Sequence, residues 1–152
     1  MNIKTKEFQL TKGEYFNIIT LKYFKRKWWL FILLFLIAGL LWLLGRFYIA
    51  LFIFVFTVIY PIFLIVFFWI YSNSKKNKIF YTKRFYEVDN EFLSAYLEDG
   101  SLQKTKLDNI IKVVKTSKYY LLYISITQFF YIPFSAFNNA EELKSFDELL
   151  KK

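Results

Sequence analysis

The chain has 152 residues and contains neither cysteine nor histidine. This composition excludes disulfides, thiolate catalysis and Cys- or His-ligated metals, and it removes the most common general base. The chain carries 21 Lys and Arg against 12 Asp and Glu, a formal net charge of +9, and 57% of it is hydrophobic. A basic protein can bind nucleic acid or an anionic membrane surface, and the position of the charged residues along the chain distinguishes the two.

The excess positive charge lies in the first half of the chain. Residues 1–77 hold ten basic and two acidic residues, whereas residues 78–152 hold eleven basic and ten acidic residues. The basic residues of the first half flank two uncharged apolar stretches. Lys and Arg at such positions orient membrane helices and attract anionic headgroups. We therefore expect a lipid bilayer, and no nucleic acid, as the partner of this charge.

Residues 1–27 are predicted to form a cytoplasmic strand followed by a helix. Thr11 and Glu14 have the spacing of a capping box, which indicates a helix start. We expect residues 1–10 to be extended and an amphipathic juxtamembrane helix to follow, with a plain polar lead-in as the alternative. The extended segment lies on the same side of the membrane as the C-terminal part and is available to it as an added strand.

Residues 28–71 are predicted to form a transmembrane helical hairpin. The uncharged stretches 28–44 and 47–71 hold 17 and 25 residues on either side of a turn at Gly45 and Arg46. A hydrocarbon core of about 30 Å requires roughly 20 apolar residues in a helix, with about 17 as the lower limit. Lipid offers the backbone no hydrogen-bond partners, so both stretches should be helical. A long lead-in and an immediate second span argue against a cleaved signal peptide.

Charge and aromatic residues define the orientation of this hairpin. Seven basic residues precede the first span and three follow the second, while the tip carries only Arg46. The positive-inside rule then places both termini in the cytoplasm. Aromatic rings are favoured at the two membrane interfaces. The predicted interface anchors are Trp28, Trp29, Trp42, Tyr48, Trp69 and Tyr71.

The residues inside the hairpin indicate a membrane anchor and not a pathway for ions or other transported substrates. Neither stretch contains an ionisable acid or base, which pumps and transporters usually need. Pro61 removes a backbone hydrogen bond near the middle of the second span, so we expect a kink there. We expect this kink to pack against the first helix near Gly39.

Residues 72–78 are predicted to be a basic linker that leaves the membrane. Basic side chains on both sides of the hairpin are candidates for contact with anionic lipid headgroups. These candidates are Lys25, Arg26, Lys27, Lys75, Lys76, Lys78, Lys83 and Arg84.

Residues 79–152 are predicted to form a small cytoplasmic domain. Runs rich in Phe, Tyr, Val, Ile and Thr have the lengths of strands, and Asp99-Gly100 indicates a hairpin turn. The expected strands are 79–88, 91–98, 101–107, 110–115, 119–126 and 128–132. Asn138 and Asn139 then offer a helix N-cap, Leu143 and Phe146 repeat at helical spacing, and Lys151-Lys152 suit the helix end. The fold class is therefore an α+β membrane protein: a two-helix transmembrane hairpin and an antiparallel β-sheet domain closed by a C-terminal helix.

The sequence predicts no catalytic, cofactor or metal site. None of the four glycines has the spacing of a phosphate-binding loop. The carboxylate pairs lie at turns or at a helix start, where solvated acids are common. Basic residues of the predicted strands either gather on one membrane-facing surface or are scattered over a solvated face, and the sequence leaves both open. They are Lys83, Arg84, Lys104, Lys106, Lys112 and Lys115.

One motif runs from Ile132-Pro133-Phe134 through Asn138 to Leu143 and is followed by Phe146. This motif resembles the YcxB-like family of small bacterial membrane proteins. Residues 110–113 are similar to the family's central strand, and Glu14-Tyr15 to its N-terminal pair. A Trp often found before that strand is absent here. The resemblance implies that 79–152 is a YcxB-like, pleckstrin-homology-like domain: a curved sheet capped by a C-terminal helix.

Three functions remain as hypotheses. The first is a non-enzymatic protein of the bacterial cytoplasmic membrane, with two spans, that presents its cytoplasmic domain to a protein partner or to anionic headgroups. The alternative is an immunity or resistance protein against membrane-active peptides. The third, less favoured, is a membrane-associated enzyme. A homodimer is compatible with a hairpin that buries few helix faces.

Overall fold

The structure, a computed structural model, describes residues 2–126 and 128–150. The chain divides into two compact units. Thr11–Ile79 form a helical hairpin, and Met1–Leu10 together with Phe80–Lys152 form a β-rich domain. Two long helices, two antiparallel sheets and a C-terminal helix confirm the α+β class.

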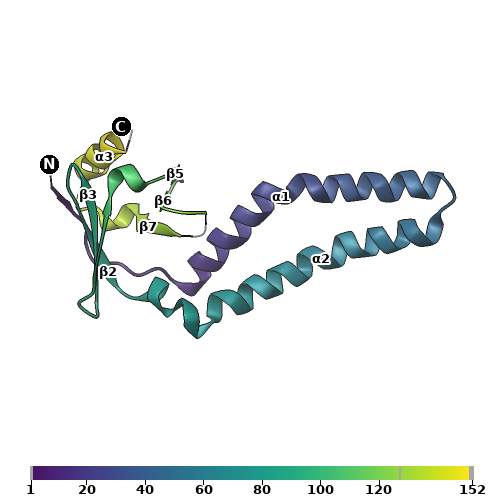
Figure 1. The fold of residues 1–152 in the computed structure, drawn as a ribbon, viewed down its shortest axis with the longest axis horizontal. Helices are drawn as coiled ribbons and strands as arrows, with labels where there is room; N and C mark the ends of the chain where they lie inside the picture. Colours follow the sequence, from purple (N-terminus) through teal and green to yellow (C-terminus); the bar gives the residue numbers. More distant parts are fainter. Residues whose placement is uncertain (1, 127, 151–152) are drawn as a thin grey trace. The chain divides into compact units, whose positions relative to one another are not determined.

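The hairpin consists of α1 (Lys12–Leu43) and α2 (Phe47–Asn73), which run antiparallel beside each other (Figure 1). The predicted capping box is confirmed: the Glu14 N–H donates to Thr11 Oγ1 at 3.2 Å, and the Thr11 N–H donates to Glu14 Oε2 at 2.8 Å. The expected juxtamembrane helix and first span form one continuous helix of 32 residues.

Both helices are long and apolar enough to cross a membrane. Within their most apolar windows of 18 residues, only 6% of the α1 window and 17% of the α2 window is buried. A helix in the core of a soluble protein is mostly covered by its neighbours, whereas these two leave their apolar side chains exposed.

Aromatic rings form the seam between the two helices. Phe35 contacts Phe54 with ring centroids 5.7 Å apart, and Phe31 contacts Tyr60 at 6.4 Å. The expectation that the Pro61 region packs near Gly39 is wrong. Tyr60, next to Pro61, faces Phe31. The turn is tight, so residues at equal distances from it along the two helices lie opposite each other. α2 continues as one helix through Pro61.

The domain contains two antiparallel sheets and not one. The first has the order β1 (Ile3–Lys4), β2 (Arg84–Val88), β3 (Phe92–Leu97), β4 (Leu102–Lys106). The second has the order β5 (Lys112–Lys115), β6 (Tyr119–Tyr123), β7 (Phe129–Pro133). Three short 3-10 helices are η1 (Lys75–Tyr81), η2 (Leu107–Asn109) and η3 (Phe134–Ala136), and the last element is α3 (Ala140–Leu149).

The sheets separate where η2 interrupts the expected meander. The Leu107 N–H donates to Glu91 O at 2.8 Å and ends the β3–β4 ladder, and the Ile110 N–H then donates to Leu107 O at 3.0 Å, which turns the chain before β5 begins. The predicted turn between β3 and β4 is present, with Gly100 at φ 81°, a conformation that favours glycine. The expected strand at 79–88 begins only at Arg84, because η1 occupies the chain as far as Tyr81.

The core of the domain lies between the sheets and α3. Tyr86, Leu93, Leu122, Ile132 and Phe146 are each fully buried there. The predicted apolar face of α3 is therefore confirmed through Phe146. Lys151 and Lys152, expected at the helix end, lie outside the described residues.

The N-terminal segment belongs to the domain. Ile3 pairs with Val88 and Lys4 with Glu87, so β1, which precedes the hairpin, pairs with β2, which follows it. The Thr5 N–H donates to Tyr86 O at 2.9 Å, and Thr5 Oγ1 accepts from the Tyr86 N–H at 2.8 Å. The hairpin is thus an insertion between the first two strands of one sheet.

Candidate functional site

Apart from Arg46 at the tip, the basic residues of the hairpin lie at its other end. Lys25 and Arg26 are exposed on α1, and Lys27 is half-buried. Lys75 and Lys78 are exposed in η1, while the side chain of Lys76 lies outside what the structure describes. Contact of these residues with lipid headgroups stays a prediction.

The remaining two headgroup candidates belong to the domain. Lys83 is exposed just before β2, and Arg84 is half-buried within it. The Arg84 N–H donates to Phe8 O at 3.0 Å, and its Nε donates to Thr82 O at 3.2 Å. Arg84 therefore has a structural place in the strand in addition to its predicted role.

The six predicted interface anchors are all exposed on the hairpin. Their exposed fractions are 59% for Trp28, 50% for Trp29, 55% for Trp42, 92% for Tyr48, 60% for Trp69 and 45% for Tyr71. Trp42 and Phe47 contact each other across the tip with ring centroids 5.0 Å apart. Exposure is what an interfacial anchor requires, and the role itself stays a prediction.

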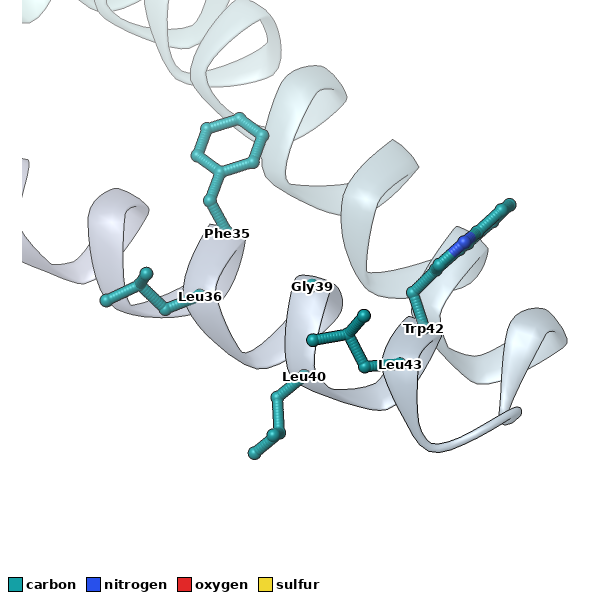
Figure 2. A pocket seen from close by; sticks show the side chains of 6 residues that line it. All are labelled: Phe35, Leu36, Gly39, Leu40, Trp42 and Leu43. Carbon is teal, nitrogen blue, oxygen red and sulfur yellow. The ribbon is translucent and has the colours of Figure 1, made fainter.

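A shallow hollow of about 540 Å³ lies on the surface of α1 (Figure 2). Its lining residues are Phe35, Leu36, Gly39, Leu40, Trp42 and Leu43. Gly39 leaves the space open, since a Cβ built there would meet nothing within 4 Å. The hollow is lined almost entirely by apolar groups and holds no acid or base for catalysis.

The basic strand residues are divided between the two sheets. Lys104 and Lys106 lie on β4 over the Phe92 ring, 4.0 and 5.8 Å from its centroid. Lys112 and Lys115 lie on β5, in the other sheet. Lys115 turns toward α3, where its Nζ donates to Asp147 Oδ2. The structure therefore does not place these lysines on one face of one sheet.

Asp147 is the centre of a polar cluster that the sequence did not reveal. Tyr120 Oη donates to Asp147 Oδ1, and Lys115 occupies the other carboxylate oxygen. Tyr120 is 1% exposed, and burial, with the Asp147 hydrogen bond, raises its pKa to about 12. The cluster ties β5 and β6 to α3. No local pattern predicts it, because Lys115 and Tyr120 are 32 and 27 residues from Asp147.

The carboxylates of the turns have structural partners. Asp89 Oδ1 accepts the Glu91 and Phe92 N–H groups, each at 2.7 Å, and these bonds lower its pKa. Glu87, which lies within β2, pairs with Lys4 at 2.9 Å, and this contact lowers the pKa of Glu87. Across residues 2–126 and 128–150, no three His, Cys, Asp or Glu side chains are grouped as a metal site would require.

The motif around Asn138 holds the N-terminal segment in place. Asn138 Nδ2 donates to Lys4 O at 2.9 Å and to Glu142 Oε2 at 3.0 Å. The Lys6 N–H donates to Ala136 O at 2.7 Å. Asn139 caps α3 by accepting the Glu142 N–H at 2.7 Å. This stretch therefore caps α3 and also holds the segment that precedes the hairpin through hydrogen bonds.

Comparisons with known proteins give one positive finding. No curated protein and no solved structure matches the chain. A family model does match, and it covers the domain from the end of β2 to the end of α3. Residues 88–150 match the family described as "YcxB-like protein", which confirms the resemblance carried by the Asn138 motif.

Proposed function

We propose that the chain is an integral protein of the bacterial cytoplasmic membrane whose hairpin anchors a small, non-enzymatic interaction domain at the inner bilayer surface. The observation that carries this proposal is the position of the hairpin within the domain. β1 and β2 are sheet neighbours, yet the whole hairpin lies between them in the chain.

This connectivity joins the domain to its anchor at two neighbouring points. The Phe8 and Arg84 backbones pair in both directions, and Gln9 Nε2 donates to Tyr81 O. The two links to the hairpin therefore leave the domain side by side. A domain on one flexible linker samples many orientations, whereas two adjacent links restrict its rotation. Such attachment suits a domain that must meet its partner at the membrane.

The chemistry of the domain supports binding over catalysis. Asp89 and Asp99 at the turns accept backbone N–H groups, and Glu87 of β2 pairs with Lys4. The two sheets with a closing C-terminal helix are compatible with the pleckstrin-homology-like arrangement that the family resemblance implies. We propose a cytoplasmic protein or an anionic headgroup as the partner of this surface.

Topology is the decisive test, and the absence of cysteine makes it direct. Arg46→Cys at the tip and Lys112→Cys in the domain each give a single thiol in the full chain. On intact cells, a membrane-impermeant maleimide should label Arg46→Cys, and Lys112→Cys should react only after lysis. The reverse pattern would refute the orientation. Release of the protein from membranes by alkaline carbonate would refute insertion.

A further inference from the structure

The ring contacts along the hairpin fix which residues of α1 and α2 lie level with each other. Phe31 faces Tyr60 with centroids 6.4 Å apart, and Tyr23 faces Phe68 at 5.5 Å. Lys25, Arg26 and Lys27 lie between these two contacts on α1. On α2 the corresponding interval is 61–67, which contains no charged residue. Three cations of one helix therefore lie level with an uncharged part of the other.

This offset comes from the unequal apolar lengths of the two helices. Both uncharged stretches start at the same turn, but that of α2 holds 25 residues and that of α1 holds 17. Eight further helical residues extend about 12 Å at 1.5 Å per residue. Phe67, Trp69 and Ile70 of this extension are 50%, 60% and 59% exposed. These side chains need an apolar cover at the depth where α1 is basic.

The cations have no carboxylate within the hairpin to pair with. The sequence contains no Asp or Glu between Glu14 and Glu87. Glu14 is used at the start of α1, where it accepts both the N–H and the hydroxyl of Thr11. An unbalanced cluster of cations beside apolar surface therefore favours an anion from outside the hairpin.

Lys27 has the most constrained position of the three. It is half-buried, and its spacing of four residues from Tyr23 and from Phe31 places it on their face of α1. Tyr23 also approaches α2 through its hydroxyl, 3.2 Å from that of Tyr60. The stem of Lys27 can therefore pack along the seam while its ammonium reaches outward to an anion.

We propose that this end of the hairpin is a binding site for an anionic phospholipid of the inner leaflet. Lys27 donates to the phosphate, Lys25 and Arg26 add positive charge around it, and the acyl chains cover the exposed side chains of α2 between residues 62 and 70. Charge complementarity favours this occupant, because one molecule supplies both the anion and the apolar cover. The inference rests on the proposed membrane insertion.

Native mass spectrometry of the full chain in non-ionic detergent tests the site. Phosphatidylglycerol and phosphatidylcholine with identical acyl chains are the probes, with inorganic phosphate as a competitor. Phosphatidylglycerol should be retained over phosphatidylcholine. Lys27→Gln should weaken its retention about fivefold, the effect of one basic residue near an anionic surface. Lys27→Arg should keep the retention of phosphatidylglycerol. Arg46→Gln, which removes one positive charge at the tip, should leave this retention unchanged.

Three results would each overturn the proposal. They are equal retention of the two lipids, unchanged retention by Lys27→Gln, and displacement of phosphatidylglycerol by millimolar inorganic phosphate, which would indicate a phosphate site without lipid. Carbonate extraction of the same variants distinguishes the absence of a lipid site from the absence of membrane insertion, on which the proposed function depends. A protein that stays in the membrane but shows no lipid preference refutes the lipid site alone.

Discussion

Single side chains decide how α3 is attached to the domain. The Tyr120 hydroxyl and the Lys115 ammonium share the two oxygens of Asp147, and the Tyr120 ring packs against Phe146 at 5.3 Å. A hydrogen bond to a charged group contributes more than one between neutral groups. One carboxylate therefore carries the polar contacts of α3 with β5 and β6, beside the apolar packing of Phe146.

We expect Tyr120→Phe to lower the free energy of unfolding of the domain by about 1–2 kcal/mol, because it removes one charged hydrogen bond and keeps the ring. Denaturant titration of the full chain in detergent, followed by hydrogen exchange of β6 and α3, measures this loss. Tyr48→Phe is the matched control, since Tyr48 is 92% exposed. Equal stability of the two variants would contradict the role of the hydroxyl.

The same cluster predicts loss of stability at high pH. The pKa of Tyr120 is raised from 10.0 to about 12 in the folded domain. The unfolded chain therefore ionises first, so the contribution is complete below pH 10 and disappears as the pH rises to about 12. Alkaline unfolding should be shallower in Tyr120→Phe than in the parent chain when both are followed by hydrogen exchange.

Acid should destabilise the domain through carboxylates whose pKa is lowered in the folded state. Lys4 lowers the pKa of Glu87 below its usual 4.5, and backbone N–H groups lower that of Asp89. Lowered pKa values stabilise the fold above the unfolded value and lose that effect as the pH falls through the folded value. We expect the protection factors of the β1 amides, corrected for the intrinsic exchange rate, to fall below about pH 4.5. Glu87→Gln should reduce this pH dependence, whereas Glu98→Gln should leave it unchanged.

Among the elements, β1 is the smallest and has the largest consequences. It contains only Ile3 and Lys4, yet Ile3 is 2% exposed and belongs to the core. Its contacts reach both β2 and the Asn138 motif. The strand therefore joins the two ends of the sequence that make up the domain.

Ile3→Ala should destabilise the domain by about 2–4 kcal/mol, the usual cost of truncating a buried Ile. Hydrogen exchange should accelerate in β2 and at residues 134–138, while α1 and α2 remain unchanged. Asn2→Ala, an exposed neighbour, serves as the control. A uniform change across hairpin and domain would show that the two units do not unfold separately.

The local elements were predictable, and the contacts between distant segments were not. The uncharged stretches, the Thr11 capping box and the Asp99-Gly100 turn each carry their own signal within a few residues. The Asp147 cluster and the pairing of Thr5 with Tyr86, 81 residues away, depend on tertiary contact and leave no local pattern. The start of β2 was misplaced because Ile79, Phe80 and Tyr81 have strand propensity but lie in η1.

At the scale of the whole molecule, the two units share a chain but differ in where their apolar side chains lie. The hairpin exposes apolar side chains, and the domain buries its own in a core. Deleting residues 2–10 should therefore leave the hairpin in the membrane and weaken only the domain. Carbonate extraction and limited proteolysis of the shortened chain measure the two effects independently. Loss of membrane retention would contradict this separation.

The pairing of β1 with β2 also determines when the domain can be completed during synthesis. β1 is made before the hairpin, and β2 with the rest of the sheet is made after it. In the proposed topology both helices must cross the membrane to return the chain to the side of β1. Insertion of one helix alone would hold Ile3 and Val88 on opposite sides of the membrane, so closure of this sheet would report that both helices had crossed.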